Sequence, residues 1–105
     1  MDQNMLTALT NEFKNRLRVT WEDENENKII SDYILSGDHY LQGFAMGCAI
    51  DYNKDLYAKE LLYNYVLYCR SDALAQFRDA YSRDLLRLRI DYRHRLLRDD
   101  SMTGV

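Results

Sequence analysis

The sequence predicts an all-α protein: a compact bundle of about four helices followed by an extended basic C-terminal tail. The 105 residues contain no proline and only four glycines, so most residues that interrupt helices are missing. Apolar side chains also recur with a period near 3.6 over most of the chain. This length fits one domain with a modest core. We divide the chain into a helical domain, residues 1–87, and a tail, residues 88–105.

The first helix is predicted over residues 4–18, with Asp2 or Asn4 able to cap its start. Its apolar positions are Met5, Leu6, Leu9, Phe13 and Leu17. This spacing places them on one face of a helix, which we expect to pack on the core.

The stretch "WEDENENKII" from Trp21 resembles a calcium loop, because acceptor side chains alternate at Asp23, Asn25 and Asn27. A calcium loop needs Gly at its sixth position and Glu at its twelfth, and counted from Asp23 these are Lys28 and Ile34. We therefore interpret the stretch as the start of the second helix. Thr20 and Asp23 form its cap, and the acidic side chains lie at the positive end of the helix dipole.

The second helix is predicted to be interrupted or to end between Gly37 and Gly43. Residues 36–55 carry three of the four glycines and are predicted to be the main loop, with residues 48–52 as a candidate extended segment. Residues 56–69 are apolar on almost every side, which is typical of a central helix. Ser71 or Asp72 is then a predicted N-cap, so residues 56–87 favour two helices over one.

The C-terminal segment fits two periods. Apolar residues alternate with arginines from Leu86 to Leu96, which is strand spacing, but Leu85, Leu88, Tyr92 and Leu96 also fit a helix. The sequence contains no second strand candidate of similar length. We therefore interpret the segment as one whose structure is completed by binding to a partner.

Arginine is the only cation type in this tail, apart from one histidine. Residues 83–98 hold six Arg and two Asp, a local charge of +4 in a chain whose net charge is −3. Arginine suits bidentate pairing with carboxylates or phosphates, although a solvated helix face is the alternative. The candidate docking residues are Arg87, Arg89, Ile90, Tyr92, Arg93, Arg95, Leu96 and Arg98.

No metal, cofactor or catalytic site is expected. The four candidate zinc ligands His39, Cys48, Cys69 and His94 lack the paired short intervals of structural zinc sites. Asp38 and His39 suggest acid–base chemistry, but the chain has no nucleophile elbow and no phosphate-binding glycine loop. The cysteines are expected to be reduced, since no secretory signal is evident.

Nine tyrosines are many for a chain of this length. Tyr63, Tyr65, Tyr68 and Tyr81 lie on apolar stripes that indicate the core. Tyrosine is also favoured at subunit interfaces, where an apolar surface keeps a polar tip. Self-association and ordinary core packing explain the excess equally well.

Two stretches resemble the small head–tail connector, or adaptor, proteins of tailed bacteriophages and prophages. They are "RVTWEDENENKIISDYI" and "IDYNKDLYAKELLYNYVLYCRSDALAQFRDAYSRDLLRLRI", and the resemblance runs from about Phe13 to Ile90. Its most specific parts are the Trp21-Glu22-Asp23 start, the helix from Ala58 to Arg70, and the pattern of Phe77, Tyr81, Leu85, Leu86 and Leu88. These are packing and capping signatures, not catalytic motifs.

The resemblance implies a helical, non-enzymatic protein of the virion neck, present in the host cytoplasm before assembly. Such proteins form a ring, typically twelve-fold, beneath the portal protein. The ring extends the DNA channel and links the capsid to a stopper or other tail-completion protein, and DNA passes without sequence-specific binding. The C-terminal segment, here about Leu88 to Val105, would dock onto the portal.

A second hypothesis belongs to another class. The strip from Arg83 to Arg98 could instead contact DNA in a small helical nucleic-acid-binding regulator, whose affinity would fall steeply with salt. A sequence pI near 5.3 argues against general nucleic-acid binding.

Overall fold

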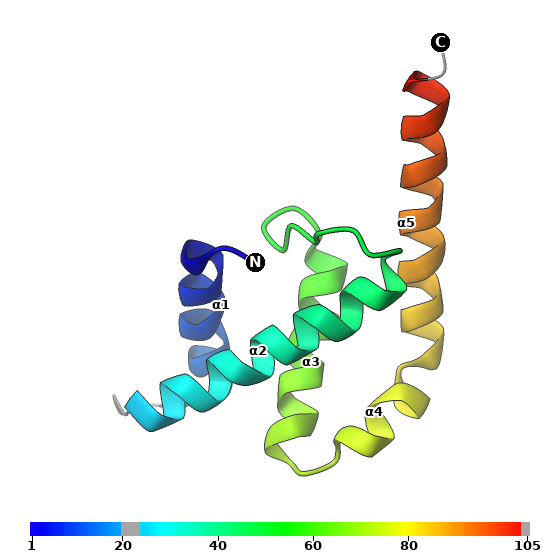
Figure 1. Ribbon diagram of the computed structural model, residues 1–105. Helices are drawn as coiled ribbons and strands as arrows, with labels where there is room; N and C mark the ends of the chain where they lie inside the picture. The colour runs from blue at the N-terminus through cyan, green and yellow to red at the C-terminus, as the bar shows by residue number, and fades with distance from the viewer. Residues whose placement is uncertain (20–23, 104–105) are drawn as a thin grey trace.

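Five helices make up the described part of the chain in the computed structural model, which describes residues 1–19 and 24–103 and side chains as far as Leu97 (Figure 1). They are α1 (Gln3–Arg16), α2 (Glu24–Phe44), α3 (Leu56–Arg70), α4 (Leu74–Ala80) and α5 (Ser82–Thr103). No strand occurs within these residues, so the predicted all-α class is confirmed. The count is five instead of about four because the chain also breaks at Tyr81, between α4 and α5.

The start of α1 is capped as the sequence indicates. The carboxylate of Asp2 accepts a hydrogen bond of 2.7 Å from the backbone N–H of Met5, which satisfies one of the free donors in the first turn. The predicted cap of the second helix, Thr20 with Asp23, lies outside the described residues. The first described turn of α2 carries Glu24 and Glu26, where negative charge is favoured.

Helix α2 continues through both glycines that were expected to interrupt it, so the predicted loop over residues 36–55 is wrong in its first half. The glycine at position 37 serves packing instead of chain reversal. A Cβ at Gly37 would lie 2.7 Å from Leu62 Cδ1 and 2.8 Å from Tyr65 Cδ1, closer than atoms can pack. The missing side chain therefore lets α3 cross α2 closely, and the loop comprises residues 45–55.

Three helices end in a left-handed residue that is not glycine. These residues are Arg18, Met46 and Asp72, with φ values of 61°, 60° and 54°. The N–H of each following residue then bonds the carbonyl five positions back, as in a Schellman motif: Val19 to Lys14, Gly47 to Gln42 and Ala73 to Tyr68. Asp72 therefore ends α3. The predicted N-cap at Ser71 or Asp72 is wrong, since Ala73 precedes α4 without a side-chain cap.

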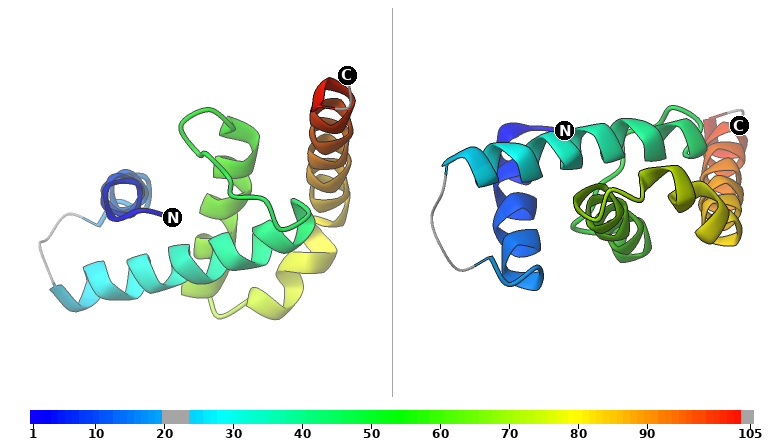
Figure 2. Two further views of the ribbon diagram at one scale, coloured as in Figure 1. Left: turned by 45° about the horizontal axis from the view of Figure 1, so that its top comes forward. Right: turned by 90° about the horizontal axis from the view of Figure 1, so that it is seen from below.

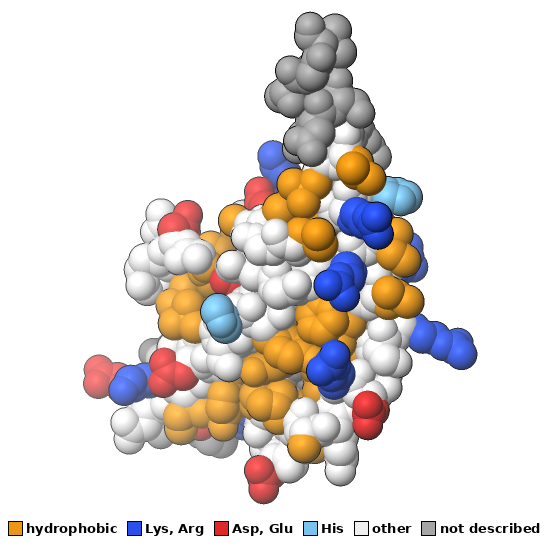
Figure 3. Space-filling view, turned by 45° about the vertical axis from the view of Figure 1, so that its right-hand side comes forward, with side chains coloured by type: hydrophobic (Ala, Val, Ile, Leu, Met, Phe, Trp, Pro, Cys, Tyr) orange, Lys and Arg blue, Asp and Glu red, His pale blue; other side chains and the backbone are white. Residues whose placement is uncertain are grey.

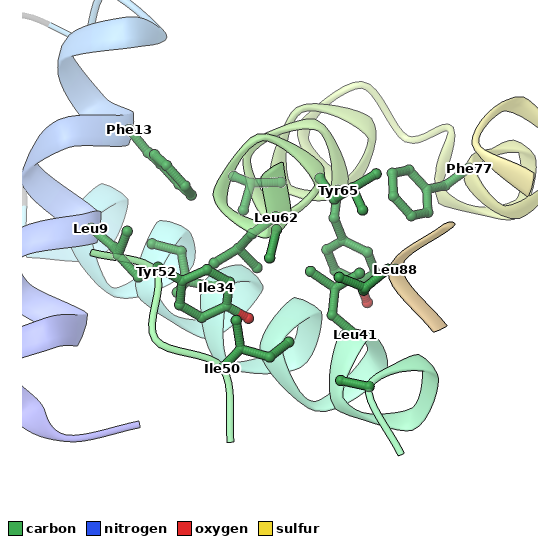
Figure 4. Packing of buried hydrophobic residues seen from close by; sticks show 14 of the residues in the cluster. Leu9, Phe13, Ile34, Leu41, Ile50, Tyr52, Leu62, Tyr65, Phe77 and Leu88 are labelled. Carbon is green, nitrogen blue, oxygen red and sulfur yellow. The ribbon is translucent and has the colours of Figure 1, made fainter. Parts of the chain in front are cut away.

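The helices are arranged along α2. Helix α1 lies near one end of α2, α3 crosses its middle, and α5 lies near the other end (Figure 2). Buried side chains from all five helices and from the loop over residues 45–55 form one core (Figure 4). The central position predicted for the helix from residue 56 is confirmed by the burial of Leu61, Leu62, Tyr65 and Val66.

A buried polar contact holds the loop to α2. Asp38 is 5% exposed and accepts a hydrogen bond of 2.7 Å from the hydroxyl of Tyr52, a side chain with no exposed surface. Gln42 donates a second bond of 2.9 Å to the same carboxylate. Residues 48–52, proposed as a candidate extended segment, form no strand, and Ile50 and Tyr52 anchor them in the core.

The C-terminal segment is helical, not extended. Helix α5 runs without a break from Ser82 to Thr103, across the predicted boundary between residues 87 and 88. Leu85 and Leu88 are each 1% exposed and Tyr92 is 5% exposed, so the first half of α5 belongs to the core. Its second half extends beyond the rest of the molecule (Figure 1), whose longest dimension is 54 Å.

Candidate functional site

The predicted docking tail forms a helix with two apolar sides, one buried and one exposed. Helical spacing places Leu85, Leu88 and Tyr92 on one side of α5, and these residues pack into the core. Leu86, Ile90 and Leu97 lie on the opposite side, and their exposed fractions are 56%, 45% and 55%. The side chains between the two apolar stripes include several arginines. We call these sides the inner face and the outer face of α5.

Polar bonds fix the inner face to the start of α3. The hydroxyl of Tyr92 donates a hydrogen bond of 2.8 Å to Asp55 Oδ2, while Asp55 Oδ1 accepts 3.0 Å from the N–H of Ala58 as the N-cap of α3. Arg95 approaches the same carboxylate at 3.7 Å. Asp55 therefore caps one helix and ties down another.

A second hydrogen bond also joins α3 to α5. The hydroxyl of Tyr57 donates 2.7 Å to Asp84 Oδ1, near the start of α5. Burial and this hydrogen bond raise the pKa of Tyr57 to about 12. Burial, together with the bond to Asp55, likewise raises the pKa of Tyr92. Both tyrosines are therefore protonated at neutral pH and can donate these two hydrogen bonds.

Two of the predicted docking arginines make cation–π contacts with tyrosine rings of the same chain. The guanidinium of Arg87 lies 4.8 Å from the ring centroid of Tyr57, and that of Arg95 lies 4.6 Å from the ring centroid of Tyr92. Such cation–π contacts stabilise the packed helix and make each guanidinium less accessible to a partner. Arg87, Arg95 and Tyr92 therefore belong to the inner side.

The remaining predicted docking residues divide as follows. Arg89, Ile90 and Arg93 are exposed on or beside the outer face, and Leu96 is half-buried. The side chain of Arg98 lies outside the described residues. Sequence reasoning missed Asp55, Tyr57 and Asp84, which position the helix. No local pattern marks them, because each bond joins residues 27 to 37 positions apart.

Of the four tyrosines predicted to lie in the core, one is buried and three are half-buried. Tyr65 is buried, while Tyr63, Tyr68 and Tyr81 are half-buried against the core. Phe77 of α4 is the centre of an aromatic cluster whose other rings include Tyr65 at 5.5 Å and Tyr81 at 4.9 Å. The cluster attaches the short α4 to α3 and explains part of the tyrosine excess.

The candidate metal ligands lie apart. His39 is on α2, Cys48 in the loop, Cys69 at the end of α3 and His94 on α5, and no group of three metal-binding side chains occurs in the part of the chain that the structure describes. Cys48 and Cys69 are free thiols. Asp38 and His39 also diverge, since Asp38 is buried against Tyr52 and His39 is exposed.

Comparison of the chain with protein-family models, with curated proteins and with solved structures gave no match. Among the described helices, none is both long enough and apolar enough to cross a membrane.

Proposed function

We propose that this protein is a structural head–tail connector of a tailed phage or prophage. In this proposal, copies assemble as a ring, twelve-fold by the resemblance, beneath the portal protein. The ring extends the DNA channel and offers a platform to the stopper. The outer face of α5 is the portal-docking surface.

The observation that carries the proposal is the division of α5. Its inner face is buried and bonded to α3, while its outer face presents Leu86, Ile90 and Leu97 to solvent next to exposed arginines. A helix that is anchored on one side and apolar on the other is typical of a segment that binds a second surface. The net charge of −3 also suits a channel wall, which should not hold phosphates.

The structure changes how the proposal should be tested. Removing all residues after Leu86 would delete Leu88 and Tyr92 from the core, so loss of binding could reflect loss of folding. The sharper variant is Ile90→Asp combined with Arg93→Glu, which alters exposed side chains only. The matched control is Leu35→Asp combined with Lys28→Glu on the exposed side of α2, where Leu35 is 42% exposed.

The measurement is native mass spectrometry and electron microscopy of the purified protein, alone and with a candidate portal protein. The proposal predicts a ring-shaped complex with the portal that the control pair forms and the Ile90/Arg93 pair does not. A complex that forms equally well with both pairs would remove the outer face of α5 as the docking surface. Absence of any complex with every portal tested would remove the connector assignment.

The alternative, a nucleic-acid-binding regulator, keeps one specific observation in its favour: Arg83, Arg89 and Arg93 are exposed on a single helix. It predicts duplex DNA binding whose logarithm falls by about 0.9 per phosphate neutralised as the logarithm of salt rises. Fluorescence anisotropy with a labelled duplex at low salt tests this, and no binding there would eliminate it.

A further inference from the structure

A groove of about 280 Å³ opens where the end of α2, α4 and the first turns of α5 meet. Its lining comprises Phe44, Arg78, Ser82, Leu85, Leu86 and Arg89. Leu85 is buried and Phe44 half-buried, whereas both arginines are exposed. The groove therefore combines an apolar base with a cationic rim. Figure 3 shows this side of the molecule, where hydrophobic and basic side chains gather next to one another.

The rim arginines have no acidic partner among the residues that the structure describes. Among the described side chains, ion pairs engage the cations of Arg16, Lys59, Arg70 and Arg95, and the N-terminal ammonium pairs with Asp38, but neither Arg78 nor Arg89 is paired. Their guanidinium groups keep their full capacity for bidentate pairing with carboxylates. Phe44, Arg78 and Ser82 were not predicted as site residues, because only the fold brings α2 and α4 beside α5.

The groove continues along α5. Ser82, Leu86, Arg89, Arg93 and Leu97 follow one another at spacings of three or four residues, which places them on one side of the helix. This track leads from the groove onto the outer face. Its length suits a partner segment of several helical turns better than a single small molecule.

We propose that the groove and this track bind an acidic amphipathic helix of a partner protein. One large apolar side chain of the partner enters the groove over Phe44 and Leu85, and carboxylates on either side of it pair with Arg78 and Arg89. The inference deepens the proposed function and rests on it, because it specifies the chemistry of the partner's docking segment. A second α5 is disfavoured as the occupant, since its arginines would face Arg89 and Arg93 across the contact.

The test is a two-dimensional ¹H–¹⁵N NMR titration of the full chain with a helical peptide that carries a leucine stripe flanked by glutamates. The matched probe is the same peptide with lysine in place of every glutamate. The proposal predicts that the acidic peptide shifts the amide signals of residues 78–93 and of Phe44, and that the lysine peptide does not. Arg89→Glu should weaken the binding about tenfold or more, the loss expected for one charged contact. Leu86→Ala should weaken it about tenfold through the loss of buried apolar surface.

Two control variants separate binding from folding and from net charge. Leu35→Ala removes an exposed leucine from α2, and Lys28→Glu makes the same change in net charge as Arg89→Glu. Both controls should bind the acidic peptide as tightly as the unaltered chain. Because Leu86 and Arg89 are exposed, thermal unfolding by circular dichroism should show all four variants folded.

Several results would overturn the inference. The first two are equal shifts of the amide signals with the lysine peptide, and no shifts with either peptide at millimolar concentration. The third is a shift of the groove's amide signals with duplex DNA instead of with the acidic peptide. The fourth is a shift of these signals with protein concentration alone, which would indicate that a second copy binds the groove. Two results separate the inference from the proposed function. A portal complex that Arg89→Glu leaves intact removes the groove but keeps the connector, whereas peptide binding without any portal complex keeps the groove and removes the connector.

Discussion

Asp55 is the residue whose replacement should most clearly separate the folding of α5 from the folding of the rest of the chain. Its side chain is 10% exposed and serves as N-cap of α3, acceptor for Tyr92 and ion-pair partner of Arg95. Asp55→Ala removes all three contacts at once. Asp2→Ala is the matched control, because Asp2 caps α1 with one bond of similar length and makes no described contact with α5.

The expected loss follows from the three contacts. An N-cap contributes about 1 kcal/mol. The hydrogen bond from Tyr92 to a charged, nearly buried acceptor contributes about 1.5 to 3 kcal/mol. The Arg95 pair adds no more than a few tenths of a kcal/mol, since that side chain is 52% exposed and 3.7 Å away. Because neighbouring contacts are not additive, we expect Asp55→Ala to lower the free energy of unfolding by about 2 to 4 kcal/mol, and Asp2→Ala by about 1 kcal/mol.

Urea unfolding followed by circular dichroism gives the two free energies, and amide hydrogen exchange locates the loss. Protection of residues 85–97 should fall in Asp55→Ala and stay unchanged in Asp2→Ala. Asp55→Asn should lose only about 1 kcal/mol, because asparagine also caps helices and its carbonyl can accept from Tyr92. Equal losses for Asp55→Ala and Asp2→Ala, with unaltered exchange in α5, would refute the claim that Asp55 ties α5 to the body.

Three further outcomes follow from the fold. Gly37→Ala should lower the free energy of unfolding in urea by about 1 to 3 kcal/mol through its clash with Leu62. Gly43→Ala on the same helix meets open space and should raise it by up to about 1 kcal/mol, so equal effects would contradict the packing role. Met46→Gly should stabilise by about 1 kcal/mol in the same assay, because glycine adopts its left-handed conformation without strain; a loss would contradict this. The pKa of Tyr57 is raised from 10.0 to about 12, so the folded chain holds this proton more tightly and its stability falls as pH rises through that range. Tyr57→Phe should make the fall of unfolding free energy with alkaline pH shallower, and an unchanged curve would contradict the role of its hydroxyl.

The sequence was a good guide to helices that end by local rules and a poor one where packing decides. The apolar spacing and Asp2 predicted the ends of α1 to within two residues. Both signals, the N-cap and the apolar stripe, depend only on residues that are close in the sequence. Gly37 misled because glycine has two uses, turning the chain and letting two helices approach. Only the position of Leu62, 25 residues away, distinguishes them. The same limit explains Asp72, whose side chain suggested a helix start while its backbone ends α3.

The site shows the same division more strongly. From Leu86 to Leu96 the residue types fit a strand and a helix equally, and the helix is favoured because Leu85, Leu88 and Tyr92 all reach the core only with helical spacing. From composition alone, the six arginines of residues 83–98 could not be distinguished as binding residues. The fold gives them different surroundings. Arg87 and Arg95 lie over tyrosine rings, whereas Arg89 and Arg93 face solvent. A binding experiment that treats the tail as one basic strip would average these two groups. Substitutions at the exposed pair are therefore informative about a partner, and substitutions at the stacked pair are informative about stability.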